Sequence, residues 1–292
     1  MTATDAVLAV LDLDAGGRVQ GHRFVDPASP VLSAADLAAT RGDGIFETIS
    51  IGSGHPQATD AHLERFVRSA RMLDLPEPDL DGWRRVIADV AERLASHREA
   101  WVKTALSRGV EGTGVPTGWA WAEPSGDFSA ARTEGIRVVL LDRGWSTDVG
   151  RTSPWLLAGA KTLSYGVNMA AKREAARRGA DDVVFVSTEG ALLEGPTSNL
   201  IARIDGTLVT PPPELGILPG TSQRDAFRFA EDRGVPTEFR RLSTDDLGDI
   251  ENAWLISSVR HAAPVRMLGD RELPVDAAFT ADLNAFLVGR TA

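Results

Sequence analysis

The chain of 292 residues contains no cysteine, one tyrosine (Tyr165) and little lysine. Lysine and arginine together number 31, but lysine occurs only at Lys103, Lys161 and Lys172. Without a thiol, the chain cannot form a disulfide, an iron–sulfur cluster, a thiolate zinc site or a cysteine nucleophile. The composition therefore excludes thiol chemistry and limits the search for a catalytic amine to three side chains.

The charge balance and the lack of long apolar runs argue against two classes of partner. The formal net charge is −10, which disfavours a broad basic surface of the kind that binds nucleic acid. No stretch approaches the roughly 20 apolar residues of a membrane span. The start, MTATDAVLAVLDLD, is typical of a first strand rather than of a signal peptide. We therefore expect a cytoplasmic protein that acts on a small molecule and binds neither nucleic acid nor membrane.

Hydrophobic periodicity predicts a mixed fold of two α+β domains with antiparallel pairing in each. Apolar residues at helical spacing indicate a helix over 61–74 with Asp60 as N-cap, and another helix after Asp81. Asp205-Gly206 is typical of a hairpin turn. Further strands are predicted over 101–107, 118–122, 136–142, 181–187, 237–242 and 253–258, and further helices over 167–178 and 221–233.

A small, polar, turn-rich stretch, EPSGDFSAARTEG, runs from Glu123 to Gly135. Such composition is typical of a connection between domains. It predicts an N-terminal α+β domain over 1–123, an interdomain linker over 124–135 and a C-terminal domain over 136–292.

Common nucleotide-binding and hydrolase motifs are missing. Gly42-x-Gly44 is followed by Glu47 where a dinucleotide-binding fold needs its third glycine, and neither a P-loop nor a nucleophile elbow occurs. The histidines lack metal-ligand spacing, which favours a metal-independent mechanism. We expect a surface or capping role for each of them, namely His22, His55, His62, His97 and His261.

Lys161 is the strongest candidate for an amine nucleophile. It follows the apolar run PWLLAGA, whereas Lys103 lies in a predicted strand and Lys172 in an arginine-rich helix with a solvated face. Burial lowers the pKa of a lysine and supplies the neutral amine that Schiff-base chemistry requires. A surface lysine that extends its ammonium group into water fits the same sequence.

Two later segments complete a pattern that suits a cofactor. Glu194 in LLEGPTSNLIA ends a predicted strand, either as a solvated turn residue or as a carboxylate that faces a heterocyclic nitrogen. GILPGTSQRDAF enters a helix with Thr221 and Ser222 at its start, which suits ordinary N-capping or a phosphate site. The lysine, the carboxylate and the helix start together resemble the parts that hold pyridoxal phosphate.

Seven short motifs follow one another along the chain: RGDGIFET (41–48), HLERF (62–66), SRG (107–109), KTLSY (161–165), LEGPTSN (193–199), GILPGTS (216–222) and SSV at Ser257. In this order they make the chain resemble the class IV, or fold-type IV, aminotransferases. The resemblance implies a two-domain α+β fold with a smaller N-terminal domain and a larger, α/β barrel-like C-terminal domain. It also implies pyridoxal 5′-phosphate as cofactor and a homodimer.

The resemblance assigns roles to individual residues. Lys161 forms the Schiff base with the cofactor and moves protons, Glu194 pairs with the pyridine nitrogen, and Tyr165 hydrogen-bonds the phenolic oxygen. Arg65 binds the phosphate, although an arginine at a helix start equally suits a surface ion pair. Further cofactor contacts fall on Ser198, Asn199, Thr221, Ser222, Ser257 and Ser258, and substrate contacts on Arg41, Phe46, Arg108 and Arg260.

Within the family, the glycine-rich SRGVEGTG resembles aminodeoxychorismate lyases, which form 4-aminobenzoate, a folate precursor, and pyruvate from 4-amino-4-deoxychorismate. The stretch GVEGTGVP (109–116) lacks the Arg-x-His pair of D-amino-acid aminotransferases, which argues against that activity. The alternative is a transaminase that acts on branched-chain or other hydrophobic amino acids with 2-oxoglutarate. A non-catalytic binding relative is a hypothesis from a different class.

Overall fold

The structure, a computed structural model, describes residues 5–290, so the outermost residues of both predicted domains, 1–4 and 291–292, lie outside it. The chain divides into two compact units. Unit 1 comprises Met1–Gly126, Ala160–Tyr165 and Arg290–Ala292, and unit 2 comprises Asp127–Gly159 and Gly166–Gly289.

This division differs in two respects from the predicted domains. It falls after Gly126, inside the predicted linker 124–135, and that stretch holds the short helix α4 (Ser129–Thr133) of unit 2. The segment Ala160–Tyr165, which carries the candidate lysine, belongs to unit 1, although it lies within the predicted C-terminal domain, 136–292. The reason is tertiary, because this segment pairs with a strand of unit 1 through a bridge between Ile45 and Thr162.

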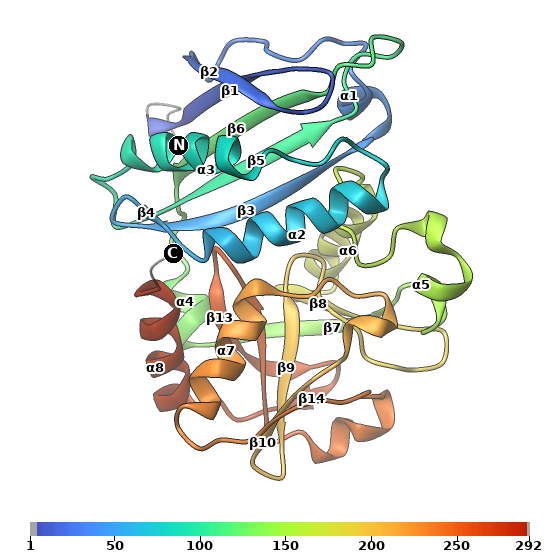
Figure 1. Cartoon of the computed structure of the whole chain (residues 1–292). Coiled ribbons are helices and arrows are strands. Elements are labelled where there is room, and N and C mark those ends of the chain that lie inside the picture. Colours follow the sequence, from blue (N-terminus) through green and yellow to red (C-terminus); the bar gives the residue numbers. More distant parts are fainter. Residues whose placement is uncertain (1–4, 291–292) are drawn as a thin grey trace. The chain divides into compact units, whose positions relative to one another are not determined.

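Unit 1 contains an antiparallel six-stranded sheet with the order β2-β1-β6-β5-β3-β4. Figure 1 shows helices α2 and α3 across one face of this sheet. The strands are β1 (Val7–Leu13), β2 (Val19–Val25), β3 (Gly44–Gly52), β4 (His55–Pro56), β5 (Glu99–Ser107) and β6 (Thr117–Pro124), and the helices are α1 (Leu37–Arg41), α2 (Thr59–Met72) and α3 (Leu80–Glu92).

Helix α2 confirms the helix predicted over 61–74 but not its cap. It begins at Thr59, and Asp60 lies in its first turn, while Ala58 occupies the N-cap position with φ 50° and without a side-chain cap. The buried ring of Phe66 on α2 meets Trp83 of α3 edge to face, with centroids 5.2 Å apart. This apolar contact accounts for the periodicity that predicts both helices.

Unit 2 is built on a mixed eight-stranded sheet with the order β11-β10-β9-β12-β13-β7-β8, and β14 pairs with β13. Its strands are β7 (Ile136–Asp142), β8 (Asp182–Val186), β9 (Asn199–Ile204), β10 (Thr207–Thr210), β11 (Thr237–Phe239), β12 (Asn252–Ser257), β13 (His261–Leu268) and β14 (Arg271–Glu272). Besides α4, its helices are α5 (Val149–Thr152), η2 (Pro154–Leu156), α6 (Gly166–Arg177), η3 (Pro213–Leu215), α7 (Thr221–Glu231), η4 (Thr244–Asp249) and α8 (Ala277–Val288).

The pairing in unit 2 is only partly the predicted one. The turn at Asp205-Gly206 joins antiparallel β9 and β10, and the φ values of 49° and 71° confirm the predicted tight turn. In contrast, β7 pairs in parallel with both β8 and β13, and β10 pairs in parallel with β11. Parallel pairing is possible because helices bridge the connections, α6 before β8 and α7 before β11.

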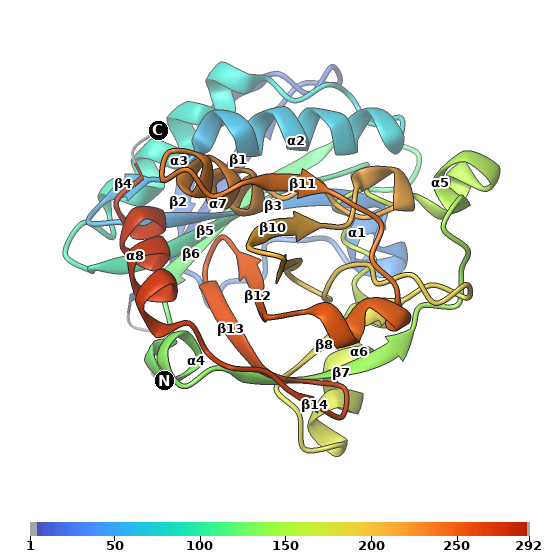
Figure 2. The ribbon, with the colours of Figure 1, turned by 90° about the horizontal axis from the view of Figure 1, so that it is seen from below.

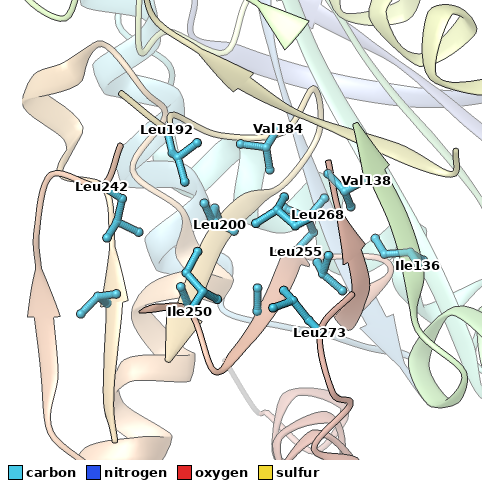
Figure 3. Close-up of a cluster of buried hydrophobic side chains, with 14 of the residues drawn as sticks. Ile136, Val138, Val184, Leu192, Leu200, Leu242, Ile250, Leu255, Leu268 and Leu273 are labelled. Carbon is cyan, nitrogen blue, oxygen red and sulfur yellow. The ribbon is translucent and has the colours of Figure 1, made fainter. Parts of the chain in front are cut away.

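Alternating side chains place one hydrophobic core on each face of this sheet. Leu200 and Leu255 belong to the core in Figure 3, whereas Ile201 and Trp254, their neighbours in sequence, pack with residues of α7 and α8. Figure 2 shows α8 beside β13. Among residues 5–290, no helix has the length and apolar character needed to cross a membrane.

Candidate active site

The side chain of Lys161 lies beside two aromatic rings of unit 1. Its Nζ is 4.6 Å from the ring centroid of Phe46 and 5.9 Å from that of Tyr165. The two rings meet edge to face with centroids 5.2 Å apart. The backbone N–H of Phe46 donates to the Lys161 carbonyl oxygen at 3.0 Å, which fixes the segment along β3. The structure thus brings three of the predicted residues together.

Helix α2 connects this segment with Arg65. The backbone N–H of Lys161 donates to Ser69 Oγ at 3.1 Å. Ser69 follows Arg65 by one helical turn, so the two side chains share a face of α2. Both residues are buried. The backbone of Lys161 therefore lies against the same face of α2 that carries Arg65.

Arg65 makes a bidentate ion pair inside unit 1. Its Nε and Nη2 each donate to a different carboxylate oxygen of Glu47 on β3, both at 2.7 Å. His62 Nδ1 lies 2.7 Å from Glu47 Oε2. The side chains of Glu47 and His62 are fully buried, so the predicted surface or capping role of His62 is wrong. His261, at 2% exposure, is also buried, which corrects the same prediction there.

The protonation states in this cluster follow from burial and charge. Burial alone would raise the pKa of Glu47, but the charge of Arg65 and hydrogen bonds from Arg65 and His62 hold that pKa far below its usual value. Burial lowers the pKa of His62 and outweighs the effect of Glu47. At neutral pH His62 is therefore uncharged. Because an ionised carboxylate only accepts hydrogen bonds, Nδ1 carries the imidazole proton.

In unit 2, the carboxylate of Glu194 accepts hydrogen bonds from both backbone and side chain. The Leu218 N–H donates to Oε1 at 3.2 Å and Asn199 Nδ2 donates to Oε2 at 3.4 Å. Asn199, at the start of β9, also donates to the Leu218 carbonyl oxygen at 2.8 Å. The structure thus brings Glu194 and Asn199 together and ties both to the segment before α7.

The start of α7 is shaped for close approach. Gly220 occupies the N-cap position, rather than Thr221 or Ser222, and no side chain of residues 5–290 caps the helix. The first N–H groups of a helix lack intrahelical partners and carry the positive end of its dipole. A Cβ on Gly220 would lie 1.9 Å from Asn199 Oδ1, so only glycine fits. This helix start suits an anionic group.

Serine hydroxyls lie near the same elements. Ser222 Oγ is 3.5 Å from Ser258 Oγ, which brings the turn after β12, following Ser257, to the first turn of α7. Ser198 Oγ is buried and has no hydrogen-bond partner among residues 5–290. Hydroxyls, backbone amides and the Glu194 carboxylate are the donor and acceptor set that a phosphorylated, protonated pyridine ring requires. The residues present therefore fit pyridoxal phosphate.

The arginines predicted to contact substrate have different surroundings. Arg41 is exposed at the last position of α1. Arg108 donates through Nε to Asp43 at 2.7 Å and through Nη2 to the Leu73 carbonyl oxygen at 2.6 Å. A third donor, Nη1, reaches the Asp74 carbonyl oxygen at 3.1 Å. Arg108 thus joins three segments of unit 1, an arrangement that favours a structural role.

Arg260 is anchored within unit 2. Its Nη1 donates to the fully buried Asp182 at 2.7 Å, and Lys172 Nζ lies 3.9 Å from the same carboxylate. Arg132 donates to the Arg260 carbonyl oxygen at 2.9 Å. The Nε and Nη2 atoms of Arg260 are buried and lack a hydrogen-bond partner in the described part of the chain. Asp182 therefore anchors this arginine inside unit 2.

Sequence reasoning overlooked three residues that the structure places near these candidates. Glu47 and His62 stand inside quoted motifs, but only their burial shows that they hold Arg65. Lys103 Nζ lies 5.4 Å from the ring centroid of Phe46, so two of the three lysines contact one ring. Burial lowers the pKa of Lys103, against the effect of Glu123. Phe46 and Lys103 share one face of the sheet because Thr48, two residues after Phe46 on β3, pairs with Lys103 on β5. The strands predicted from the sequence do not include Phe46, so this proximity came only from the structure.

Known proteins resemble this chain over nearly all of its length. The family model described as amino-transferase class IV matches residues 44–268. A relative from Mycobacterium tuberculosis, described as a bifunctional aminodeoxychorismate lyase / D-amino acid transaminase, is 43% identical over 280 residues, which cover 89% of this chain and 97% of the relative.

Solved structures give the same result. The fold IV-transaminase CpuTA1 from Curtobacterium pusillum is 53% identical, with a TM-score of 0.93 and coverage of 98% of this chain and 100% of the other. A hypothetical aminotransferase from Mycobacterium tuberculosis, solved in a PLP-bound form, is 42% identical, with a TM-score of 0.89 and coverage of 97% and 99%. Its form with alpha-ketoglutarate and PMP bound has a TM-score of 0.88, 42% identity and coverage of 96% and 99%.

Proposed function

Because the chain belongs to the class IV aminotransferases, which use pyridoxal phosphate, we propose that it is a lyase that converts 4-amino-4-deoxychorismate into 4-aminobenzoate and pyruvate. The family, the fold-type IV architecture, the enzyme class and the cofactor predicted from the seven motifs are confirmed. The lyase assignment depends on one observation, the 43% identity to a relative whose described activities include aminodeoxychorismate lyase.

Each candidate residue has a defined task in this proposal. The bound cofactor supplies an aldehyde that condenses with amines and a ring that withdraws electrons. Lys161 holds and moves protons at Nζ, beside Phe46 and Tyr165. Glu194, fixed by Asn199, stabilises the proton on the ring nitrogen. The family resemblance assigns phosphate binding to Arg65, and the first turn of α7 offers N–H groups that suit an anion.

A transaminase with 2-oxoglutarate as acceptor is the second candidate. Two observations favour it: the relative described as bifunctional, and the related structure with alpha-ketoglutarate and PMP bound. That relative is also described as a D-amino acid transaminase, which makes D-amino acids candidate donors although 109–116 lacks the Arg-x-His pair. Candidate amino donors are therefore D-amino acids as well as branched-chain and other hydrophobic amino acids.

An assay without any keto acid separates the two activities. A lyase needs no amino acceptor, so 4-amino-4-deoxychorismate alone is expected to give equal amounts of 4-aminobenzoate and pyruvate over many turnovers. If it gives neither product, while D-alanine or L-leucine converts the bound cofactor to its amine form, the protein is a transaminase and the lyase assignment is wrong. A protein that never binds pyridoxal phosphate would instead support the non-catalytic hypothesis.

The family resemblance also supports a homodimer and a place in folate formation, since 4-aminobenzoate is a folate precursor. Light scattering coupled to size-exclusion chromatography tests the first point. A mass of twice 31.2 kDa is expected, and a mass of 31.2 kDa would contradict the dimer.

A further inference from the structure

Glu47 is a fully buried carboxylate to which the proposed chemistry assigns no task. An ion of this kind is costly to bury unless its oxygens are paired and hydrogen-bonded. Here three donor atoms satisfy it, Nε and Nη2 of Arg65 and Nδ1 of His62, each at 2.7 Å. Both oxygens of Glu47 therefore accept hydrogen bonds, and two of the three guanidinium nitrogens of Arg65 donate to them.

The geometry of this pair determines how Arg65 is oriented. A guanidinium group is planar, and a carboxylate that binds its Nε and Nη2 edge fixes that plane. The N–H bonds of Nη1 then have a defined direction. His62 and Arg65 are three residues apart on α2, so both face Glu47 on β3. An arginine side chain that is not held in this way loses rotamer entropy when a ligand immobilises it.

We propose that Glu47 is a positioning residue, which together with the neutral imidazole of His62 holds the Arg65 guanidinium in the orientation that receives a phosphate group. This inference rests on the proposed function, in which Arg65 binds the phosphate of the cofactor. It goes beyond that function because it assigns a role to Glu47, a negatively charged residue beside the proposed site for an anion. A simple counter-charge at that position would weaken phosphate binding, whereas a positioning residue strengthens it.

The substitution Glu47→Gln separates these effects. Glutamine keeps the size of glutamate but replaces one acceptor oxygen by an NH₂ group that donates, so it loses the negative charge and cannot accept from Nε and Nη2 at two separate oxygens. We measure the affinities of the apoprotein for pyridoxal 5′-phosphate and for pyridoxal, which lacks the phosphate, by titration of the cofactor absorbance. The affinity ratio is the affinity for pyridoxal 5′-phosphate divided by that for pyridoxal. In Glu47→Gln we expect this ratio to fall about tenfold, which corresponds to about 1.4 kcal/mol.

Three results would overturn the inference. A larger ratio shows that Glu47 acts only as an unfavourable charge. An equal loss of both affinities shows a general structural role. If Glu47 acts through Arg65, the two substitutions are coupled, and Glu47→Gln should have a smaller effect in an Arg65→Lys background. The same effect on the affinity ratio in both backgrounds would show that Glu47 does not act through Arg65.

A milder variant keeps the test valid if Glu47→Gln does not fold. His62→Gln leaves the ion pair in place and removes the imidazole donor, so a fall of about threefold in the affinity ratio is expected. A folded His62→Gln protein with an unchanged ratio would overturn the inference. If the unmodified protein binds neither pyridoxal compound, the proposed function fails as well, whereas tight binding with an unchanged ratio contradicts the inference alone.

Discussion

The two units hold their candidate residues by different means. In unit 1, Arg65 is fixed by charged and polar side chains, Glu47 and His62, inside a buried cluster. In unit 2, Glu194 accepts from a backbone N–H, and the N-cap of α7 is Gly220, which has no room for a side chain. Side-chain pairing makes the first arrangement sensitive to charge and pH, whereas backbone packing makes the second sensitive to added volume.

The largest expected effect tests unit 1 at Lys161. Replacement by alanine removes the amine that we propose binds the cofactor, so we expect a loss of at least about 10³-fold in kcat. Borohydride reduction followed by mass spectrometry should find the cofactor attached to the unmodified chain and not to Lys161→Ala. Lys172→Ala on α6 is the matched control and should retain the adduct. An adduct on the Lys161→Ala chain would refute the assignment.

The corresponding test in unit 2 is Glu194→Gln. A neutral amide stabilises a protonated ring nitrogen less than a carboxylate does, so kcat should fall by about 100-fold while cofactor remains bound. Steady-state kinetics and cofactor absorbance measure the two quantities. The exposed Glu251→Gln serves as control. Unchanged kcat in Glu194→Gln would show that this carboxylate has another task.

The volume sensitivity of unit 2 is tested at Gly220. In Gly220→Ala the new Cβ would lie 1.9 Å from Asn199 Oδ1, so the start of α7 must shift. We expect about tenfold weaker binding of pyridoxal phosphate, measured by absorbance titration. Gly248→Ala is the matched control, because its Cβ meets no atom of the described residues within 4 Å. Equal affinities in the two variants would contradict the packing argument.

The charge sensitivity of unit 1 appears as pH dependence. His62 has a pKa below its usual 6.5 in the folded chain, so the unfolded chain binds more protons as pH falls below 6.5. Stability is therefore complete above that pH and is lost toward acid, by up to about 1.4 kcal/mol per pH unit.

Glu47 has a lowered pKa and acts in the same direction below its usual 4.5. The unfolding free energy, measured by urea unfolding at several pH values between 7 and 5, should change less with pH for His62→Gln than for the unmodified protein. Equal slopes would mean that His62 does not titrate as described.

The smallest effect concerns Arg108. It and Asp43 are partly exposed, so Arg108→Lys should cost only about 1 kcal/mol of unfolding free energy and leave KM unchanged. Chemical denaturation and steady-state kinetics measure these quantities. A rise in KM without loss of stability would instead support the substrate role predicted from the sequence.

Much of the local structure follows from the sequence. The strand predicted over 136–142 has those bounds in the structure, and the predicted helix starting at Thr221 begins there. The predicted N-cap Asp60 fails because Ala58 adopts a left-handed conformation that composition does not reveal. The antiparallel prediction fails for β7, β8 and β13 because strand order depends on crossover connections rather than on local pattern.

The sequence by itself determined the family of this protein and the cofactor that this family uses. A chain with three lysines keeps one after an apolar run at Lys161, and arginine cannot replace it because a guanidinium group stays protonated. The order of seven motifs then identified the family. Only the tertiary structure decided that Glu47 and His62 hold Arg65 and that the segment Ala160–Tyr165 belongs to unit 1. These contacts join residues far apart in sequence, and sheet register and helix packing select them.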